Sequence, residues 1–393
     1  MEKISQHIIP VFEKLNIECS TEKSDEQNIA VQLFSYNNPD GAIRWIFPAS
    51  SKSPLMLKFY GVIGWKSKLF STMMRLIFFF GMKKLIAKQY EEIFFSELEF
   101  EKYKIQLGAE WALFTGTPGK LRKALIYVSK KSERFFLKIP LTDAAKEIVN
   151  HESKFLKQLN QLNFHYTKIQ KEKSTENYLQ QSDLSVECSH RSSIWTIVHQ
   201  QSAEEIFSFT KQKKKISETE FWKKVNQNFS ELKSHQAHPS VPEWNSIVEK
   251  LFLLKNKIDV EQQIFTSIAH TDLTPWNCFC DNQKLYIYDW ELAMLDAPAL
   301  YDLFHFHLQG NCLLGNQPFE IVNQKLQGTI QQKSIQHFAA DNSIDMALHL
   351  KLYLLYHVST SMCWYAVQPN LHLQVHWLMK LWNDYLDEIL QNN

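Results

Sequence analysis

Residues 268–304 constrain the possible fold and chemistry of this chain more than any other stretch, because they hold polar residues at a spacing typical of a catalytic loop. His270, Asp272 and Asn277 form an H-x-D-x-x-x-x-N string, and Asp289 follows twelve residues later. Phosphoryl transfer needs a carboxylate that orients the acceptor hydroxyl and takes its proton, and it needs oxygen ligands that hold Mg²⁺. Asp272 fits the first role, and Asn277 with Asp289 fits the second.

The local pattern predicts a hairpin that brings the two candidate metal ligands together. Asn277–Cys280 and Leu285–Tyr288 are short β-prone runs, and the turn-forming residues 281–283 separate them. Asn277 would begin one strand and Asp289 would follow the other. We therefore expect their side chains to share one metal ion. The alternative is that all these polar residues are turn and cap residues of an ordinary hairpin.

The motifs HTDLTPWN and YDWE, followed by Pro298 and Asp302, resemble those of the aminoglycoside phosphotransferase and choline kinase group. Members of that group are small-molecule kinases with a protein-kinase-like fold. The resemblance implies that Asp272 is the catalytic base, that Asn277 and Asp289 bind Mg²⁺, and that Asp302 supports the catalytic loop.

Two departures from the group's pattern concern the shape of this loop. Thr271 stands where the group usually has glycine, and the spacing up to Asp302 is one residue longer. Neither change removes a catalytic group. We expect His270 and Asp302 to keep the loop in shape.

An earlier stretch matches a phosphate-binding hairpin. The strand-like runs Trp111–Thr115 and Lys123–Val128 flank a turn that contains Gly116, Thr117 and Gly119. Glycine allows backbone N–H groups to approach a phosphate closely, because no Cβ blocks the way. Most such turns only join strands, so the turn alone is weak evidence for phosphate binding, and neighbouring residues must supply more.

An expected lysine–glutamate pair supplies further evidence for a phosphate-binding site. Phe135–Ile139 reads as a third strand and carries Lys138, whose position suits the lysine that binds nucleotide phosphates. A helix is expected to open at Thr142 or Asp143, and it places Glu152 on its apolar face. A carboxylate there is costly unless it is paired, so Lys138 is the expected partner. The alternative is an ordinary glutamate at the edge of the stripe.

Length and composition predict how the chain divides into folded units. A chain of 393 residues with 45% hydrophobic and 22% charged residues predicts more than one folded unit. We expect an α+β protein with a two-lobed, protein-kinase-like fold: an accessory α/β segment at 1–104, a small antiparallel N-lobe at 105–183, and a mostly helical C-lobe at 184–393. The lobes would join near Ser182 and Asp183.

Charge and cysteine content bear on the partners and the cellular compartment of the protein. Lys plus Arg number 43 and Asp plus Glu number 42, which gives no overall attraction to nucleic acid. The six cysteines are scattered and favour reduced thiols in the cytoplasm. The first residues lack the pattern of a signal peptide, and no run of 18 apolar residues predicts a membrane span.

Residues 41–90 hold nine basic residues and no acidic one. The apolar block Leu76–Phe80 lies among them and is typical of a helix at a membrane interface. The strand-like runs Ile43–Phe47 and Leu55–Tyr60 favour instead a folded subdomain that packs its phenylalanines onto the kinase lobe. Both interpretations stay open.

The rest of the chain reads as mostly helical. Helices are expected at Ile194–Leu232, with the lysine-rich run 211–215 as an exposed break, and at Trp244–Leu254, Met346–Val358 and His372–Leu390. Aromatic residues in the last two form either a core or an acceptor pocket.

Together these observations predict a Mg²⁺-dependent kinase that transfers a phosphoryl group from ATP or GTP to a small hydroxylated molecule. The resemblance implies a bacterial, cytoplasmic enzyme, monomeric or dimeric, that acts on a sugar, an aminosugar or an amino alcohol. Two alternatives are a nucleotide-binding pseudokinase that serves as a scaffold, and a kinase at the inner membrane that acts on a lipid-linked or polysaccharide precursor through residues 41–90.

Overall fold

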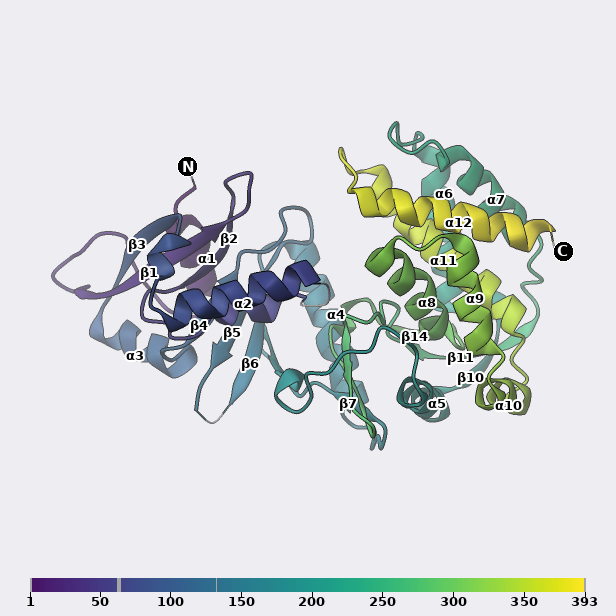
Figure 1. Ribbon diagram of the computed structural model, residues 1–393, viewed down its shortest axis with the longest axis horizontal. Coiled ribbons are helices and arrows are strands. Elements are labelled where there is room, and N and C mark those ends of the chain that lie inside the picture. Colours follow the sequence, from purple (N-terminus) through teal and green to yellow (C-terminus); the bar gives the residue numbers. More distant parts are fainter. Residues whose placement is uncertain (1, 62–64, 132, 392–393) are drawn as a thin grey trace. The chain divides into compact units, whose positions relative to one another are not determined.

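The computed structural model describes residues 2–61, 65–131 and 133–391, so residues 62–64 of the basic region lie outside the described residues. The chain is α+β, as predicted, and divides into two compact units (Figure 1). Unit 1 comprises Met1–Gln161 and Ile169–Glu187, and unit 2 comprises Leu162–Lys168 and Cys188–Asn393.

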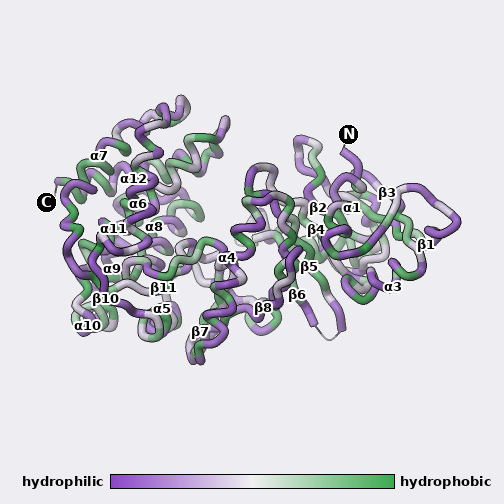
Figure 2. The backbone as a smooth tube through the Cα atoms, turned by 180° about the vertical axis from the view of Figure 1, so that it is seen from behind, coloured by the Kyte–Doolittle hydropathy of each residue, from purple (hydrophilic) through white to green (hydrophobic). Residues whose placement is uncertain are grey.

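Unit 1 is built on one eight-stranded antiparallel sheet in the order β3-β1-β2-β4-β5-β6-β9-β8. Its strands are β1 (Ile29–Asn37), β2 (Ile43–Pro48), β3 (Gln89–Phe95), β4 (Trp111–Phe114), β5 (Lys123–Ser129), β6 (Arg134–Pro140), β8 (Glu172–Ser174) and β9 (Leu179–Ser182). Residues 1–104 thus supply three strands of the same sheet that holds the predicted N-lobe strands. Figure 2 shows hydrophobic stretches along these strands and hydrophilic stretches in the loops at the sheet's edge.

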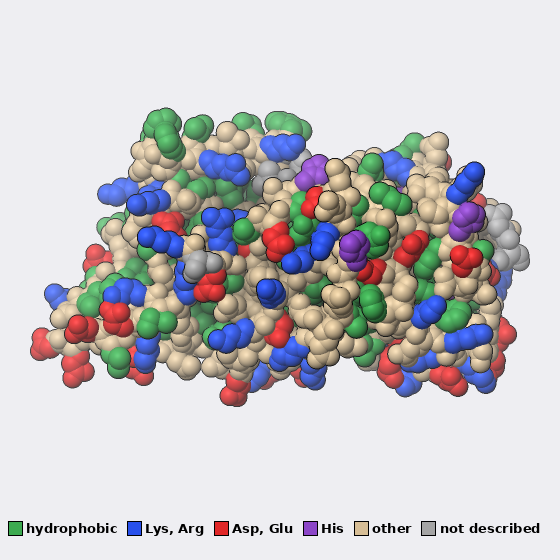
Figure 3. All heavy atoms as spheres, turned by 90° about the horizontal axis from the view of Figure 1, so that it is seen from below, with side chains coloured by type: hydrophobic (Ala, Val, Ile, Leu, Met, Phe, Trp, Pro, Cys, Tyr) green, Lys and Arg blue, Asp and Glu red, His purple; other side chains and the backbone are tan. Residues whose placement is uncertain are grey.

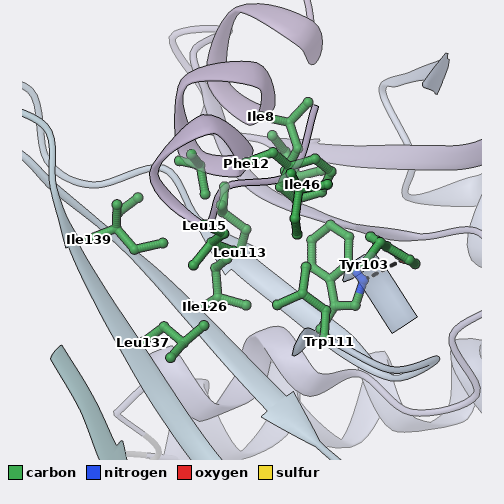
Figure 4. Packing of buried hydrophobic residues seen from close by; sticks show 14 of the residues in the cluster. Ile8, Phe12, Leu15, Ile46, Tyr103, Trp111, Leu113, Ile126, Leu137 and Ile139 are labelled. Atoms are coloured by element: carbon green, nitrogen blue, oxygen red, sulfur yellow. Dashed lines mark hydrogen bonds between the residues drawn. The ribbon is translucent and has the colours of Figure 1, made fainter. Parts of the chain in front are cut away.

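Strand alternation gives this sheet two apolar faces, because successive side chains point to opposite sides. Leu33 and Ile46 lie on the face covered by α1 (Ser5–Lys14) and α3 (Glu97–Gln106). Figure 4 shows this core, in which the Trp111 indole N–H donates to the Tyr103 hydroxyl at 2.8 Å.

The opposite face carries a second core. Phe34, Trp45 and Phe47 lie there and are covered by α2 (Trp65–Phe79) and by a 3₁₀ helix, η1 (Leu55–Phe59). The prediction of a strand at Leu55–Tyr60 was therefore wrong, because this segment forms a 3₁₀ helix. The segment coils across the sheet because Met56, fully buried, covers this apolar face, and its polar neighbour Lys58 reaches a carboxylate elsewhere in the unit.

That carboxylate belongs to Asp183, at the expected hinge. It accepts hydrogen bonds from Lys58 Nζ at 2.8 Å, from the Tyr127 hydroxyl at 2.7 Å and from the Ser185 backbone N–H at 2.9 Å. Burial opposes the charge of Asp183, but the Lys58 ammonium and these hydrogen bonds lower the pKa of the carboxyl overall. η1 and the end of the unit are thereby tied together.

The helix predicted from Thr142 or Asp143 is α4 (Asp143–Leu159). The Thr142 hydroxyl accepts from the Ala145 N–H at 3.2 Å, which satisfies one of the free N–H groups of the first turn. The apolar stripe of α4 buries Phe155, Leu156 and Leu159. Unit 1 also contains η2 (Lys83–Leu85) and η3 (Leu184–Val186).

Unit 2 is mostly helical. Its helices are α5 (Ile197–Thr210), α6 (Glu220–Ser234), α7 (Trp244–Asn256), α8 (Tyr301–Gly315), α9 (Phe319–Ile330), α10 (Lys333–Asp341), α11 (Met346–Ala366) and α12 (Leu373–Gln391), with η4 (Ile216–Glu218) and η5 (Trp290–Leu292). Two small sheets accompany them, β10-β11-β14 and β12-β13-β7, made of β7 (Thr167–Ile169), β10 (Gln212–Lys215), β11 (Gln263–Ala269), β12 (Cys278–Cys280), β13 (Leu285–Ile287) and β14 (Met294–Pro298). The helices predicted near residues 244, 346 and 372 are confirmed.

The lysine-rich run 211–215 is not the exposed loop that we expected. Residues Gln212–Lys215 form strand β10, which pairs antiparallel with β11. Lys214 Nζ lies 3.2 Å from the buried carboxylate of Asp296, and Lys215 Nζ lies 2.8 Å from Glu261. The backbone pairing and these carboxylates hold the run in place, although its side chains show no apolar alternation.

Among the described residues, no helix is both long and apolar enough to cross a bilayer. All six cysteines are free thiols, and five of them are buried.

Candidate active site

The predicted hairpin is present in unit 2. Strands β12 and β13 pair antiparallel with Cys278 opposite Ile287, and the Tyr288 N–H donates to the Asn277 carbonyl at 3.2 Å. Asn277 therefore lies opposite Tyr288, the residue just before Asp289. The sequence correctly placed the two candidate metal ligands at the same end of one hairpin.

Asp302, on the first turn of α8, holds the backbone of the loop that follows β11. Its carboxylate accepts the N–H of His270 at 2.8 Å and the N–H of Thr271 at 2.9 Å. Burial raises the pKa of Asp302, while the two N–H groups that donate to its carboxylate act in the opposite direction. The longer spacing before Asp302 thus still lets it contact the loop.

Thr271 has a left-handed backbone, with φ of 62°. A β-branched residue rarely adopts this conformation, because its Cβ approaches the following carbonyl. Two bonds hold it there: the N–H donates to Asp302, and the hydroxyl donates to the Leu292 carbonyl at 2.6 Å. A positive φ is a physical reason for glycine at such a position, and it implies backbone strain when threonine occupies it.

His270 is fully buried and links the loop to the end of the hairpin. Its Nε2 lies 3.0 Å from the Tyr288 carbonyl, and its Nδ1 accepts the Asp272 backbone N–H at 3.2 Å. This pattern assigns the ring proton to Nε2. The expectation that His270 shapes the loop therefore has a structural basis in these two bonds.

The carboxylate of Asp272 has a hydrogen-bond donor on each oxygen. Asn277 Nδ2 donates to Oδ2 at 2.8 Å, and His305 Nε2 lies 3.1 Å from Oδ1. The side chain keeps 35% of its surface exposed, so it is held in place and still accessible. Burial raises the pKa of Asp272 to about 6; the negative charge of Asp289 adds to this rise, and the hydrogen bond from Asn277 opposes it.

His305 and Tyr353 extend this network and were missed by the sequence reasoning. Burial lowers the pKa of His305 to about 3, so the ring is neutral and its Nε2–H donates to Asp272. The remaining nitrogen, Nδ1, accepts from the Tyr353 hydroxyl at 3.4 Å. The position of His305, one helical turn after Asp302, was a usable signal. Nothing in the sequence pointed to Tyr353.

Arg191 fixes the hairpin from a distant part of the chain and was also missed. Its guanidinium donates to the carbonyls of Trp276 and Cys278, the latter at 3.3 Å, and to the Tyr288 hydroxyl at 2.7 Å. It also lies 4.1 Å from the centre of the Phe279 ring. One side chain thus joins both strands next to the candidate metal ligands.

The chemistry of Asn277 and Asp289 fits a magnesium ion. The amide nitrogen of Asn277 donates to the carboxylate and to the carbonyl of Asp272, so Oδ1 is the atom suited to coordination. Asp289 has a left-handed backbone with φ of 70°, which aspartate tolerates better than most residues. Amide and carboxylate oxygens are ligands that Mg²⁺ prefers.

Unit 1 contains the predicted ion pair. Lys138 Nζ lies 2.9 and 2.8 Å from the two carboxylate oxygens of Glu152, and Gln181 Nε2 donates to the same carboxylate at 2.8 Å. All three side chains are buried. A buried pair adds little stability relative to an apolar replacement. Its presence therefore marks a candidate functional position.

The glycine turn joins β4 to β5. Gly116 has φ of 81°, and a Cβ there would meet the Lys123 carbonyl oxygen at 2.2 Å. The turn itself therefore requires this glycine. Gly119 has φ of 141° and open space around the missing Cβ, and Thr117 is exposed. The part of the turn that is open to a ligand is thus the Thr117–Gly119 side.

No protein-family model and no curated protein matches the sequence. Solved structures do match. Choline kinase LicA from Streptococcus pneumoniae is 11% identical with a TM-score of 0.44, and the match covers 75% of this chain and 98% of that chain. An ethanolamine kinase from Plasmodium vivax is 14% identical with a TM-score of 0.46, and the match covers 86% of this chain and 94% of that chain.

The aminoglycoside phosphotransferase APH(2'')-Ib, in its ADP-bound form, is 13% identical with a TM-score of 0.43, and the match covers 75% of this chain and 96% of that chain. The chain is thus similar to solved structures of the group that its motifs resemble, the aminoglycoside phosphotransferases and choline kinases.

Proposed function

We propose that this protein is a Mg²⁺-dependent phosphotransferase that transfers the γ-phosphoryl group of ATP or GTP to a hydroxyl of a small molecule. The observation that carries the proposal is the state of Asp272: both carboxylate oxygens are held, by Asn277 and by His305, while a third of the side chain stays open. A carboxylate with this support suits a base that must orient one hydroxyl.

In the proposed reaction Asp272 accepts a hydrogen bond from the acceptor hydroxyl and aligns its oxygen with the γ-phosphorus. The new oxygen–phosphorus bond forms as the bond to the β-phosphate oxygen breaks, the hydroxyl proton passes to Asp272, and a nucleoside diphosphate leaves. The protein's part is positioning and charge neutralisation.

The other groups serve the nucleotide. Lys138, oriented by Glu152 and Gln181, is proposed to bind phosphate oxygens, and the N–H groups of the Thr117–Gly119 turn to approach them. Asn277 and Asp289 would hold Mg²⁺, which neutralises phosphate charge when it is bound. Sugars, aminosugars and amino alcohols are the acceptor classes that we would screen first.

Thermal unfolding with ATP, GTP and ADP, each with and without Mg²⁺, tests nucleotide use. A ligand present at a hundred times its dissociation constant stabilises the fold by about 2.7 kcal/mol. We expect a Mg²⁺-dependent rise in Tm with at least one triphosphate. Asp289→Asn should abolish this rise, and Asp341→Asn, at an exposed position on α10, serves as the control.

Turnover separates catalysis from binding. Asp272→Asn should keep the Mg²⁺-nucleotide shift and lose turnover by a factor of about 10² to 10⁴. Wild-type turnover in Asp272→Asn would contradict the role of this residue. Absence of a shift with every nucleotide at millimolar concentration would instead favour a scaffold that has lost nucleotide binding.

A further inference from the structure

Helix α2 (Trp65–Phe79) and the residue after it expose a row of large apolar side chains. They are Trp65, Leu69, Met73, Leu76, Phe79 and Phe80, and their exposed fractions range from 46% for Met73 to 80% for Phe79. Figure 3 shows hydrophobic side chains projecting along the upper edge where α2 lies, with lysine and arginine side chains beside them. We call these six residues the α2 apolar face.

This face has no part in holding the helix to its sheet. The opposite side of α2 does that, because Met74 and Phe78 are buried in the core formed with Phe47. Each residue advances about 100° around an α-helix, so the α2 apolar face falls within an arc of about 120° and the buried residues fall opposite. The helix is apolar on two sides, and the fold uses only one of them.

Basic residues border the exposed arc on both sides. At about 100° per residue, Lys66 stands beside one edge, and Lys68 and Arg75 stand beside the other. All three are exposed. No acidic residue occurs anywhere from 41 to 90, so the nearest charges in the sequence share one sign.

Lys83, another basic residue of the segment 41–90, is not part of this basic border. Its ammonium donates to the carbonyls of Ala49 and Ser51, the latter at 2.7 Å, and burial lowers its pKa. It closes a turn of unit 1. A test of surface charge should therefore leave Lys83 intact.

We propose that the α2 apolar face docks into the interface of a membrane rich in anionic lipid. Aromatic and aliphatic side chains would enter the boundary between headgroups and acyl chains, and the bordering basic side chains would contact lipid phosphates. A second copy of the chain is a poorer occupant. In a two-fold dimer the same patch meets itself, so the basic borders would approach each other with no acidic partner from this segment.

The proposal does not depend on phosphoryl transfer, so its test needs no substrate. The full-length protein is mixed at low salt with vesicles of phosphatidylcholine alone and with vesicles of phosphatidylcholine plus phosphatidylglycerol, and binding is measured by co-sedimentation. We expect binding to the phosphatidylglycerol vesicles that weakens as salt is added, and much weaker binding to phosphatidylcholine.

Matched variants locate the surface. Lys66→Glu/Lys68→Glu should weaken vesicle partitioning by at least about 30-fold, whereas Lys23→Glu/Lys333→Glu, with the same net charge change at exposed positions, should change it much less. Leu76→Ser/Phe79→Ser should also weaken vesicle binding strongly. Its control is Leu98→Ser/Ile105→Ser on α3, where both residues are equally exposed.

Two results would overturn the proposal. One is no binding of the wild type to phosphatidylglycerol vesicles at low salt. The other is a dimer in analytical ultracentrifugation that Leu76→Ser/Phe79→Ser converts to monomer without any effect of lipid. An unchanged Tm in each variant, expected for exposed positions, shows that loss of binding is not loss of folding.

Discussion

His305 Nε2 lies 3.1 Å from Asp272 Oδ1, although the two residues are 33 positions apart and lie on different elements. The bond fixes one oxygen of the proposed base, and Asn277 fixes the other. The carboxylate plane is therefore set by two side chains, one of which is also a candidate metal ligand. In the proposed mechanism His305 therefore acts through Asp272, as a positioning residue.

The first prediction concerns this bond. His305→Ala should lower kcat by about 10²-fold, because a misplaced base loses alignment with the reacting hydroxyl. KM should stay near the wild-type value. His305→Gln should recover part of the loss, since its amide N–H can also donate. Steady-state kinetics, with each substrate varied in turn while the other is saturating, tests this.

His337→Ala, at an exposed position on α10, is the control for that experiment. If His305→Gln were no more active than His305→Ala at equal thermal stability, His305 would only be a packing residue.

The second prediction concerns the strained loop. Thr271→Ala keeps a Cβ on a left-handed backbone and loses the hydroxyl bond to Leu292, so we expect a loss of about 1 kcal/mol in the free energy of unfolding. Thr271→Gly loses the same bond but relieves about 1–2 kcal/mol of strain. Urea denaturation should thus show Thr271→Gly to be the more stable variant. The reverse order would mean that the backbone here is not strained.

The third prediction concerns Arg191. A lysine cannot reach the carbonyls of Trp276 and Cys278 and the Tyr288 hydroxyl together, because it is a point donor and not a planar fork. Arg191→Lys should therefore loosen the hairpin and raise the Mg²⁺ concentration needed for the nucleotide-dependent rise in Tm. Tyr288→Phe removes only one of the bonds and should shift it less. An unchanged Mg²⁺ requirement in Arg191→Lys would contradict a role at the metal site.

The fourth prediction concerns pH. Burial lowers the pKa of His307 and of His349 to about 4 in the folded protein, against about 6.5 in the unfolded chain. Below pH 6.5 the unfolded chain therefore binds protons that the folded one does not. Stability is complete above that pH and falls with acidification by about 1.4 kcal/mol per pH unit for each histidine, down to about pH 4.

His307→Leu isolates one of these contributions. Both ring nitrogens of His307 lack a hydrogen-bond partner among the described residues, so the change removes no bond there. We expect near-normal stability at neutral pH and a shallower acid slope in urea unfolding measured between about pH 7 and pH 5. An unchanged slope, equal to that of the exposed-site control His337→Leu, would show that His307 is already protonated when folded.

The parts of the site that the sequence predicted are those set by local spacing. The hairpin that carries Asn277 and Asp289 follows from two short runs and a turn. The pairing of Lys138 with Glu152 follows from helix periodicity and from the cost of burying a lone carboxylate. In each case the decisive interaction is short in sequence or has one obvious partner.

The parts that were missed depend on tertiary contacts. Tyr353 meets His305 across 48 residues, and Arg191 meets Tyr288 across 97. No periodicity connects such positions. The 3₁₀ helix at Leu55–Phe59 and strand β10 were also missed because tertiary contacts decide their conformation. The 3₁₀ helix packs on the apolar face of the large sheet, and β10 pairs with strand β11.

The shared sheet of unit 1 has a consequence for any attempt to shorten this protein. Strand β2 pairs with β4 through Trp45 and Phe114, so cutting the chain after residue 104 would leave β4 with an unpaired edge. A bare, apolar strand edge invites pairing with another chain. The truncated protein would also lose the helices that cover both faces of the sheet, and we expect it to aggregate. We therefore expect residues 1–104, about a quarter of the chain, to be needed for the solubility of the remainder, so a minimal version of the protein should keep them.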